Sequence, residues 1–173
     1  MEPGIRVASV LVVLGLVACA PQVGAPLEGS IAGLVVKGAV SSSKVTAYSV
    51  DVHGRRVKPV GSTTSDDTGA FVIGVGGHFG PTLVCATGGT YVDESTGVVI
   101  GLGSGELCAL VDNFELGANV TGVLLTPFAA LHAALTGCFL DTGKETSFAS
   151  ASQRAELRFH DFLGAGIAAF DFR

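Results

Sequence analysis

The sequence predicts a mainly β fold, a seven-stranded β-sandwich followed by a short α-helical C-terminal region. Between Gly29 and Val111, short apolar segments alternate with clusters of Gly, Ser, Asp and Pro, which is the pattern of a small all-β domain. The chain has 25 glycines and no tryptophan among its 173 residues, as expected of a turn-rich β protein. From Thr126 onward the apolar spacing changes to that of helices.

Seven short strands are expected in the first region. Two packed faces are needed to bury their alternating Val, Leu and Ile residues, so a sandwich fits better than a flat sheet. The inward side chains are predicted to be Val45, Ala47, Phe71, Ile73 and Val75. The predicted strands are Ser30–Val36, Lys44–Val50, Val57–Thr64, Ala70–Val75, Thr82–Thr87, Val98–Leu102 and Glu106–Val111.

A turn is predicted where residues 65–71 read SDDTGAF. The carboxylates of Asp66 and Asp67 can accept hydrogen bonds from neighbouring backbone amides. Gly69 tolerates the positive φ that such a turn requires before the next strand begins.

Two helices are predicted within residues 124–173. Thr126 is a suitable N-cap for the first, and Pro127 suits its first helical position. The second runs from Phe148 to Leu163 and is capped by Ser147. The predicted apolar faces are Phe128, Leu131, Leu135 and Phe139 on the first helix, and Phe148, Ala151, Ala155, Phe159 and Phe162 on the second.

The N-terminus has the pattern of a secretory signal peptide. Residues 7–17 form an aliphatic run that follows a single cation, Arg6. Pro21 ends this run well short of the roughly 20 apolar residues that a membrane span needs.

The segment Leu16-Val17-Ala18-Cys19 resembles the bacterial lipobox. The resemblance implies that residues 1–18 are a lipoprotein signal peptide, that Cys19 becomes the lipidated first residue, and that residues 19–28 are a tether. Ala20 after the cysteine resembles lipoproteins sorted to the outer membrane of Gram-negative bacteria. The alternative is an ordinary signal peptidase site, which Ala18 and Ala20 also suit, beside an unmodified thiol.

Residues 29 to about 90 resemble a carboxypeptidase regulatory-like domain of the transthyretin type, and the domain is expected to span residues 29–112. The resemblance rests on Gly33 to Val35, on Lys44 to Tyr48, on His53-Gly54 and on Thr64 through Phe71. A narrower resemblance, to bacterial lipoproteins in which this domain leads into helices, rests on residues 80–97 and 124–135. The helical part continues further in those proteins, so the region 124–173 is expected to be a truncated form.

These patterns favour a lipid-anchored envelope protein whose β-sandwich is a non-enzymatic structural or interaction module. The net charge of −5 favours neither nucleic acid nor an anionic lipid surface as a partner. No cofactor is expected. The alternative is a carbohydrate- or peptide-binding surface lipoprotein that presents Tyr48, Tyr91 or the glycine-rich loops.

No catalytic or metal-binding set stands out in the sequence. Ser104 lies among glycines, but without the spacing of a nucleophile turn. The segment with Asp93 and Glu94 reads as a polar hairpin turn rather than a calcium site. Residues 74–80 lack the helix that a phosphate loop needs. The histidines are scattered, with His53 and His78 expected in loops and His132 and His160 on helix surfaces.

The remaining cysteines leave one pairing open to test. Cys85 and Cys108 are expected to share the outer face of the sandwich and are candidates for a disulfide, which leaves Cys138 as an odd, buried thiol. A second idea is a crosslink between Lys37 and Asn113, assisted by Glu106, because such strand-end pairs are joined in some surface modules.

Overall fold

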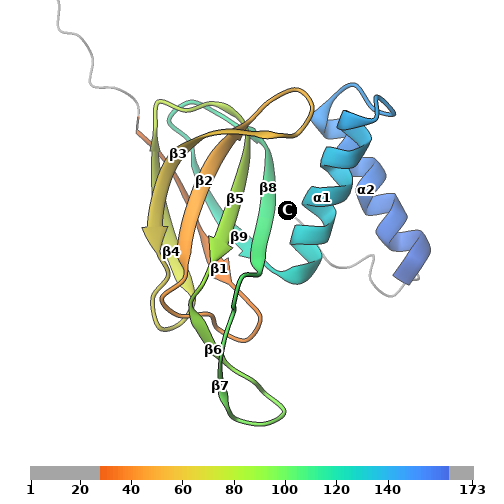
Figure 1. Ribbon diagram of the computed structural model, residues 1–173. Helices are drawn as coiled ribbons and strands as arrows, with labels where there is room; N and C mark the ends of the chain where they lie inside the picture. The colour runs from red at the N-terminus through yellow and green to blue at the C-terminus, as the bar shows by residue number, and fades with distance from the viewer. Residues whose placement is uncertain (1–27, 164–173) are drawn as a thin grey trace, which may run out of the picture.

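The computed structural model describes residues 28–163, which form two packed β-sheets with two helices along one side (Figure 1). One sheet has the strand order β4-β1-β9 and the other has β3-β2-β5-β8, while β6 and β7 form a separate hairpin. The strands are β1 (Gly29–Val35), β2 (Lys44–Val50), β3 (Arg56–Thr64), β4 (Ala70–Gly76), β5 (Gly80–Thr87), β6 (Thr90–Val92), β7 (Val99–Gly101), β8 (Glu106–Phe114) and β9 (Asn119–Leu125).

The hydrophobic core lies between the two main sheets. The five predicted inward residues, Val45, Ala47, Phe71, Ile73 and Val75, are all buried in it, as predicted. Strand alternation explains this, because residues two apart point to the same face of a sheet.

The two main sheets contain a strand that the sequence analysis missed. β9 pairs in parallel with β1 and brings Val123 and Leu125 into the core. Its pattern is broken by Gly122, which has φ 80°, and by a register irregularity opposite Ile31 and Gly33. The sheets therefore extend past the predicted boundary at residue 112.

The segment predicted as strand 98–102 is not part of the sandwich. Its central part is β7, which pairs with β6 in the hairpin and not with either main sheet. This hairpin projects from the end of the molecule opposite to the start of β1 (Figure 1).

The helices follow β9 directly. α1 (Pro127–Asp141) is capped by Thr126, whose Oγ1 accepts a hydrogen bond from the Ala129 amide at 3.0 Å, and Pro127 occupies the first turn as predicted. α1 packs along β8, and α2 (Phe148–Leu163) packs against α1. Neither of these helices is long and apolar enough to cross a membrane.

The predicted apolar faces of the helices are only half right. Phe128 and Leu131 are 53% and 51% exposed, and Phe162 is 89% exposed. The residues that α1 buries are Ala129, His132, Thr136, Phe139 and Leu140. α1 contacts both a sheet edge and α2, so small and polar side chains are enclosed while two large apolar ones point outward.

Candidate functional site

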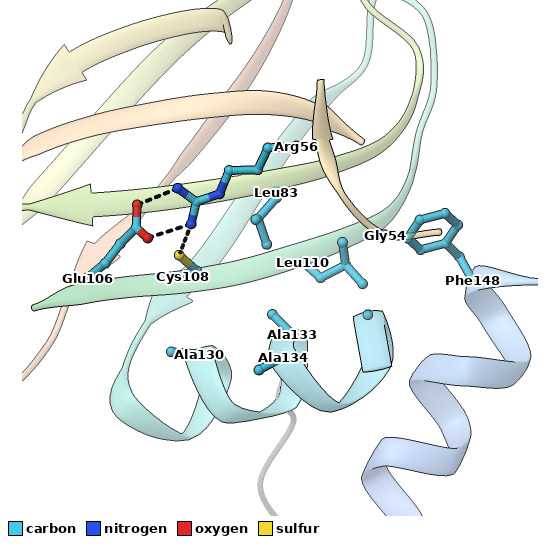
Figure 2. Close-up of a pocket in the computed structure, with 11 residues that line it drawn as sticks. Gly54, Arg56, Leu83, Glu106, Cys108, Leu110, Ala130, Ala133, Ala134 and Phe148 are labelled. Carbon is cyan, nitrogen blue, oxygen red and sulfur yellow. Dashed lines mark hydrogen bonds and ion pairs between the residues drawn. The ribbon is translucent and has the colours of Figure 1, made fainter. Parts of the chain in front are cut away.

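A cleft of about 380 Å³ lies between the outer face of the four-stranded sheet and α1 (Figure 2). Its sheet side has apolar side chains and one ion pair, and its helix side has small residues. The lining residues are Gly54, Arg56, Leu83, Glu106, Cys108, Leu110, Ala130, Ala133, Ala134, Gly137 and Phe148. We refer to this cavity as the cleft.

Arg56 and Glu106 form a two-point ion pair at one end of the cleft. Nη1 of Arg56 donates to Oε1 of Glu106 at 2.8 Å, and Nη2 donates to Oε2 at 2.5 Å. The hydrogen bonds from Arg56 to the Glu106 carboxylate raise the pKa of the guanidinium further above its ordinary value. The charge of the guanidinium is therefore balanced within the cleft by its two-point contact with Glu106.

A disulfide joins Cys85 and Cys108 beneath this ion pair. The two residues are direct cross-strand partners on β5 and β8, with Cα atoms 4.1 Å apart. Their neighbours Val84, Ala86 and Ala109 point into the core, so both cysteines occupy the outer face.

The guanidinium of Arg56 also contacts both sulfur atoms. Nη2 lies 3.2 Å from Sγ of Cys85 and 3.4 Å from Sγ of Cys108. The Tyr48 ring supports the guanidinium, with 5.1 Å between the ring centroid and Cζ. Arg56 is thus held in place by an anion, an aromatic ring and two sulfurs.

The turn between β2 and β3 fastens α1 to the sheet. Asp51 Oδ1 accepts from the amides of His53 and Arg55, each at 2.9 Å, and Gly54 has φ 76°. A Cβ on Gly54 would lie 2.9 Å from the Cα of Gly137 in α1. An ion pair between Arg55 and Asp141 adds to this contact, which closes one end of the cleft.

Three side chains that can ligate metals lie close together beside the polar end of the cleft. One ligand atom from each of Cys85, Glu106 and Cys108 lies within 4.8 Å of the others. While the disulfide is formed neither sulfur is a thiolate, and the Arg56 guanidinium occupies the same atoms. This arrangement opposes a bound cation.

The predicted cysteine assignments have different outcomes. Cys19 lies outside the described residues, as do the signal peptide 1–18 and most of the tether. The Cys85–Cys108 pairing is the one that the structure contains. Cys138 is exposed on α1, so the expectation of a buried thiol was wrong. α1 packs against β8 on one side and α2 on another, and Cys138 lies on the part of the helix that neither of them covers.

The proposed crosslink between Lys37 and Asn113 does not fit the structure. Lys37 lies over the Tyr91 ring, with Nζ 5.3 Å from its centroid, beside the β6–β7 hairpin. Asn113 lies near the opposite end of β5, where Phe114 is paired with Gly80. The length of β5, about 23 Å at 3.3 Å per residue, separates these ends. Glu106 is meanwhile paired with Arg56.

Three of the four histidines lie where they were expected. His53 and His78 are in loops and His160 is exposed on α2. His132 is only 2% exposed, so its predicted place on a helix surface was wrong. Its Nε2 lies 3.2 Å from the carbonyl oxygen of Ser152, and its ring contacts Phe159, because α2 covers this side of α1.

The remaining candidates have local structural roles. Asp93 Oδ1 accepts hydrogen bonds from the amides and hydroxyls of Ser95 and Thr96 at 2.6–3.1 Å, which holds the hairpin turn together. Ser104 lies exposed in the turn before β8. Residues 74–80 contain the end of β4 and the link to β5, and His78 there contacts the Thr82 hydroxyl at 2.8 Å.

Sequence reasoning did not find Arg56 or the helix side of the cleft. The only signals were a basic pair, Arg55-Arg56, and the run of small residues in α1. Two other cavities, of about 390 and 420 Å³, lie near His78 and near Tyr91. Within the described residues, the cleft is the one of these three that combines an ion pair with the disulfide.

No protein-family model matches the chain, and no curated protein does. Among solved structures, it is similar to a DUF3823 family protein from Parabacteroides merdae ATCC 43184, with 15% identity and a TM-score of 0.35, over 60% of this chain and 48% of that one. It is also similar to a 9R-lipoxygenase from Cyanothece PCC8801, with 9% identity and a TM-score of 0.37, over 68% of this chain and 24% of that one. The chain thus spans about half and about a quarter of these two proteins, and neither likeness identifies an activity.

Proposed function

We propose that the chain is a lipid-anchored protein of the cell envelope, at the outer membrane of a Gram-negative bacterium. In this proposal its transthyretin-like β-sandwich is a non-enzymatic interaction module. The lipobox-like segment ending at Cys19 and the carboxypeptidase regulatory-like motifs support the anchor and the domain type. The disulfide agrees with an oxidising compartment, because disulfides persist mainly outside the cytoplasm.

The cleft is the feature of the structure that supports a binding function. Its volume of about 380 Å³, its leucine and alanine walls and its single ion pair have the character of a binding surface with one orienting polar group. The polar groups that line it, Arg56 and Glu106, are already paired with each other. The described lining residues therefore offer no side-chain base held against a nucleophile.

The shape of the cleft favours a peptide over a sugar. Sugars stack on open aromatic faces, but Tyr48 lies against the Arg56 guanidinium, and Tyr91 lies between Lys37 and the core. The walls of the cleft instead suit an apolar peptide side chain. Leu83 and Leu110 face the alanines of α1 across the gap, with Phe148 at the far end (Figure 2).

The position of the β6–β7 hairpin, at the end of the molecule away from the tether, is compatible with a tethered module. The tether joins the molecule at the start of β1, so a membrane anchor lies at that end in this proposal. The β6–β7 hairpin lies at the other end (Figure 1). The long side of the sandwich, with the cleft, stays open to partners in the same compartment.

Cell fractionation tests the anchor. In the producing bacterium the native protein should be found in the outer-membrane fraction, whereas Cys19→Ala should leave that fraction or remain as uncut precursor. A Cys138→Ser variant is the matched control, because it removes an exposed thiol without touching the lipobox. Recovery of Cys19→Ala in the outer-membrane fraction at the level of the native protein would contradict the anchor.

Peptide and glycan arrays test the cleft. The protein should bind peptides with an apolar anchor residue. Ala133→Leu, which fills the cleft, should abolish that binding, while Ala149→Leu on the exposed face of α2 should retain it. Binding to glycans, or peptide binding that Ala133→Leu leaves unchanged, would contradict this role.

A further inference from the structure

We propose that the Cys85–Cys108 disulfide is a thiol-exchange site, which accepts a small neutral thiol through the cleft, with Cys108 as the attacked sulfur and Cys85 as the leaving group. Two features of the structure support this assignment. They are the access to Sγ of Cys108 and the cation held against both sulfurs.

Access is restricted to one end of the disulfide. Cys108 lines the cleft and is 8% exposed, whereas Cys85 is not among the lining residues and is 2% exposed. The cleft is large enough for a small thiol, and its leucine and alanine walls favour an uncharged one. An incoming thiol therefore meets Sγ of Cys108 first.

The leaving group follows from the attacked sulfur. Displacement at a disulfide sulfur proceeds with the entering and leaving sulfurs on opposite sides of the attacked atom, so attack at Sγ of Cys108 expels Sγ of Cys85.

Arg56 supplies the charge that the leaving group needs. Its Nη2 lies 3.2 Å from Sγ of Cys85 and 3.4 Å from Sγ of Cys108. A guanidinium at these distances stabilises the thiolate that forms when the disulfide opens, which is that of Cys85 after attack on Cys108. Glu106 and the Tyr48 ring hold this guanidinium in place, so they are positioning residues. A thiolate that leaves more readily makes exchange faster.

The step is balanced as an ordinary exchange. The thiolate of the incoming thiol forms a bond to Sγ of Cys108, the Cys85–Cys108 bond breaks, and its electron pair remains on Sγ of Cys85. The proton of the incoming thiol goes to solvent. A second molecule of the thiol then attacks the mixed disulfide, which releases Cys108 as a thiolate and a symmetrical small disulfide as the oxidised product.

Mapping of the mixed disulfide tests the direction. Full-length protein carrying Cys138→Ser is treated with 2-mercaptoethanol, quenched with acid at early times and digested for mass spectrometry. The adduct should form on Cys108 at least about tenfold faster than on Cys85. Equal adducts on both cysteines, adducts mainly on Cys85, or exchange only in denaturant that unfolds the domain would each overturn the proposal.

Substitution of Arg56 tests the leaving group. Arg56→Gln should slow exchange by about three- to tenfold at equal thiolate concentration, and Arg56→Lys should restore part of the rate. A purely structural role of Arg56 predicts the opposite, since a loosened sheet exposes the disulfide and exchanges faster. An unchanged or higher rate in Arg56→Gln would therefore remove Arg56 from the mechanism.

Two measurements test the route through the cleft. Ala130→Leu, which places a larger side chain between α1 and the sheet, should slow exchange, while Ala149→Leu on α2 should leave it unchanged. In the unsubstituted cleft, a thiol linked to a large dextran polymer should react much more slowly than 2-mercaptoethanol. Equal rates for the two thiols would contradict entry through the cleft. These readouts are independent of peptide binding and of the membrane anchor.

Discussion

Arg56 and Glu106 lie on strands that are separated by two others, yet their side chains meet in a two-point ion pair over the outer face of the sheet. The guanidinium reaches across Tyr48 and rests against both sulfurs of the Cys85–Cys108 disulfide. One side chain therefore connects the edge strand β3 with the covered strand β8. This contact defines the polar end of the cleft.

Loss of the charge on Glu106 should weaken the fold slightly. The two side chains are 39% and 30% exposed, so solvent screens the pair, and Glu106→Gln should lower the free energy of unfolding by about 0.5–1 kcal/mol. Urea unfolding at low and high salt checks this, with Glu94→Gln on the hairpin as the control. A loss that is the same at both salt concentrations would argue against an ionic contribution.

Removal of the disulfide should have a larger effect. The bond closes a loop with a sequence separation of 23, for which chain entropy predicts a loss of about 3 kcal/mol in the Cys85→Ala/Cys108→Ala variant. Addition of dithiothreitol should bring the native protein to the same stability. Cys138→Ser, which changes an exposed thiol, should stay within about 0.5 kcal/mol of the native protein. A native protein insensitive to reductant would contradict the bond.

A single methyl group added at Gly54 should disrupt the contact between the β2–β3 turn and α1 and destabilise the fold. Gly54→Ala introduces both a strained φ of 76° and a Cβ only 2.9 Å from Gly137. Gly143→Ala is the matched control, because its φ is 66° and its Cβ meets nothing within 4 Å. Backbone strain should lower the free energy of unfolding of both variants by about 1 kcal/mol. Crowding against Gly137 should lower that of Gly54→Ala by about 1–3 kcal/mol more.

Amide hydrogen exchange separates these two contributions. In Gly54→Ala the amides of α1 should exchange faster than in Gly143→Ala, since the fastening at Gly137 and Asp141 is lost. Equal exchange in the two variants would show that the turn does not hold the helix.

Asp66 should make the stability of the fold depend on pH in the acid range. Hydrogen bonds from the Thr68 hydroxyl, and then from the Thr68 and Ala70 amides, hold the pKa of Asp66 below its ordinary value of 3.8. A lowered folded pKa means that its stabilisation is present above pH 3.8 and is lost as the pH falls through the folded pKa.

The variant Asp66→Asn checks this pH dependence. The native protein should be more stable than the variant at neutral pH, and the difference should shrink as the pH falls below 3.8. Asp67→Asn at the neighbouring exposed position is the control and should show a smaller difference at neutral pH. A stability difference that is constant down to acid pH would contradict the role of the Asp66 charge.

The regular parts of the fold could be predicted from local sequence. Alternation in β2 and β4 located the core residues, and the Thr126-Pro127 pair located the start of α1. β9 could not be located, because Gly122 interrupts its alternation and its partner β1 lies far away in the sequence. A long-range parallel pairing leaves no local signal for the residues that it will join.

The site was predictable only in part. The alternation of each strand predicted that Cys85 and Cys108 point to the outer face of the sheet, because their neighbours point into the core. The structure places the two cysteines directly opposite each other on β5 and β8. Arg56 could not be found in the same way, since its reach across two strands depends on the twist and bulges of β3. The exposure of Phe128 and the burial of His132 depended on which surfaces enclose α1, which its own periodicity does not determine.

We propose an anchored module in which, among residues 28–163, a disulfide joins Cys85 to Cys108. The most direct test is a peptide map of protein purified from the membranes of the producing bacterium, alkylated without reductant. We expect an acylated Cys19 as the first residue, a linked Cys85–Cys108 peptide pair, and alkylation at Cys138 alone. An uncut N-terminus with an alkylated Cys19, or alkylation at Cys85 and Cys108, would contradict the account.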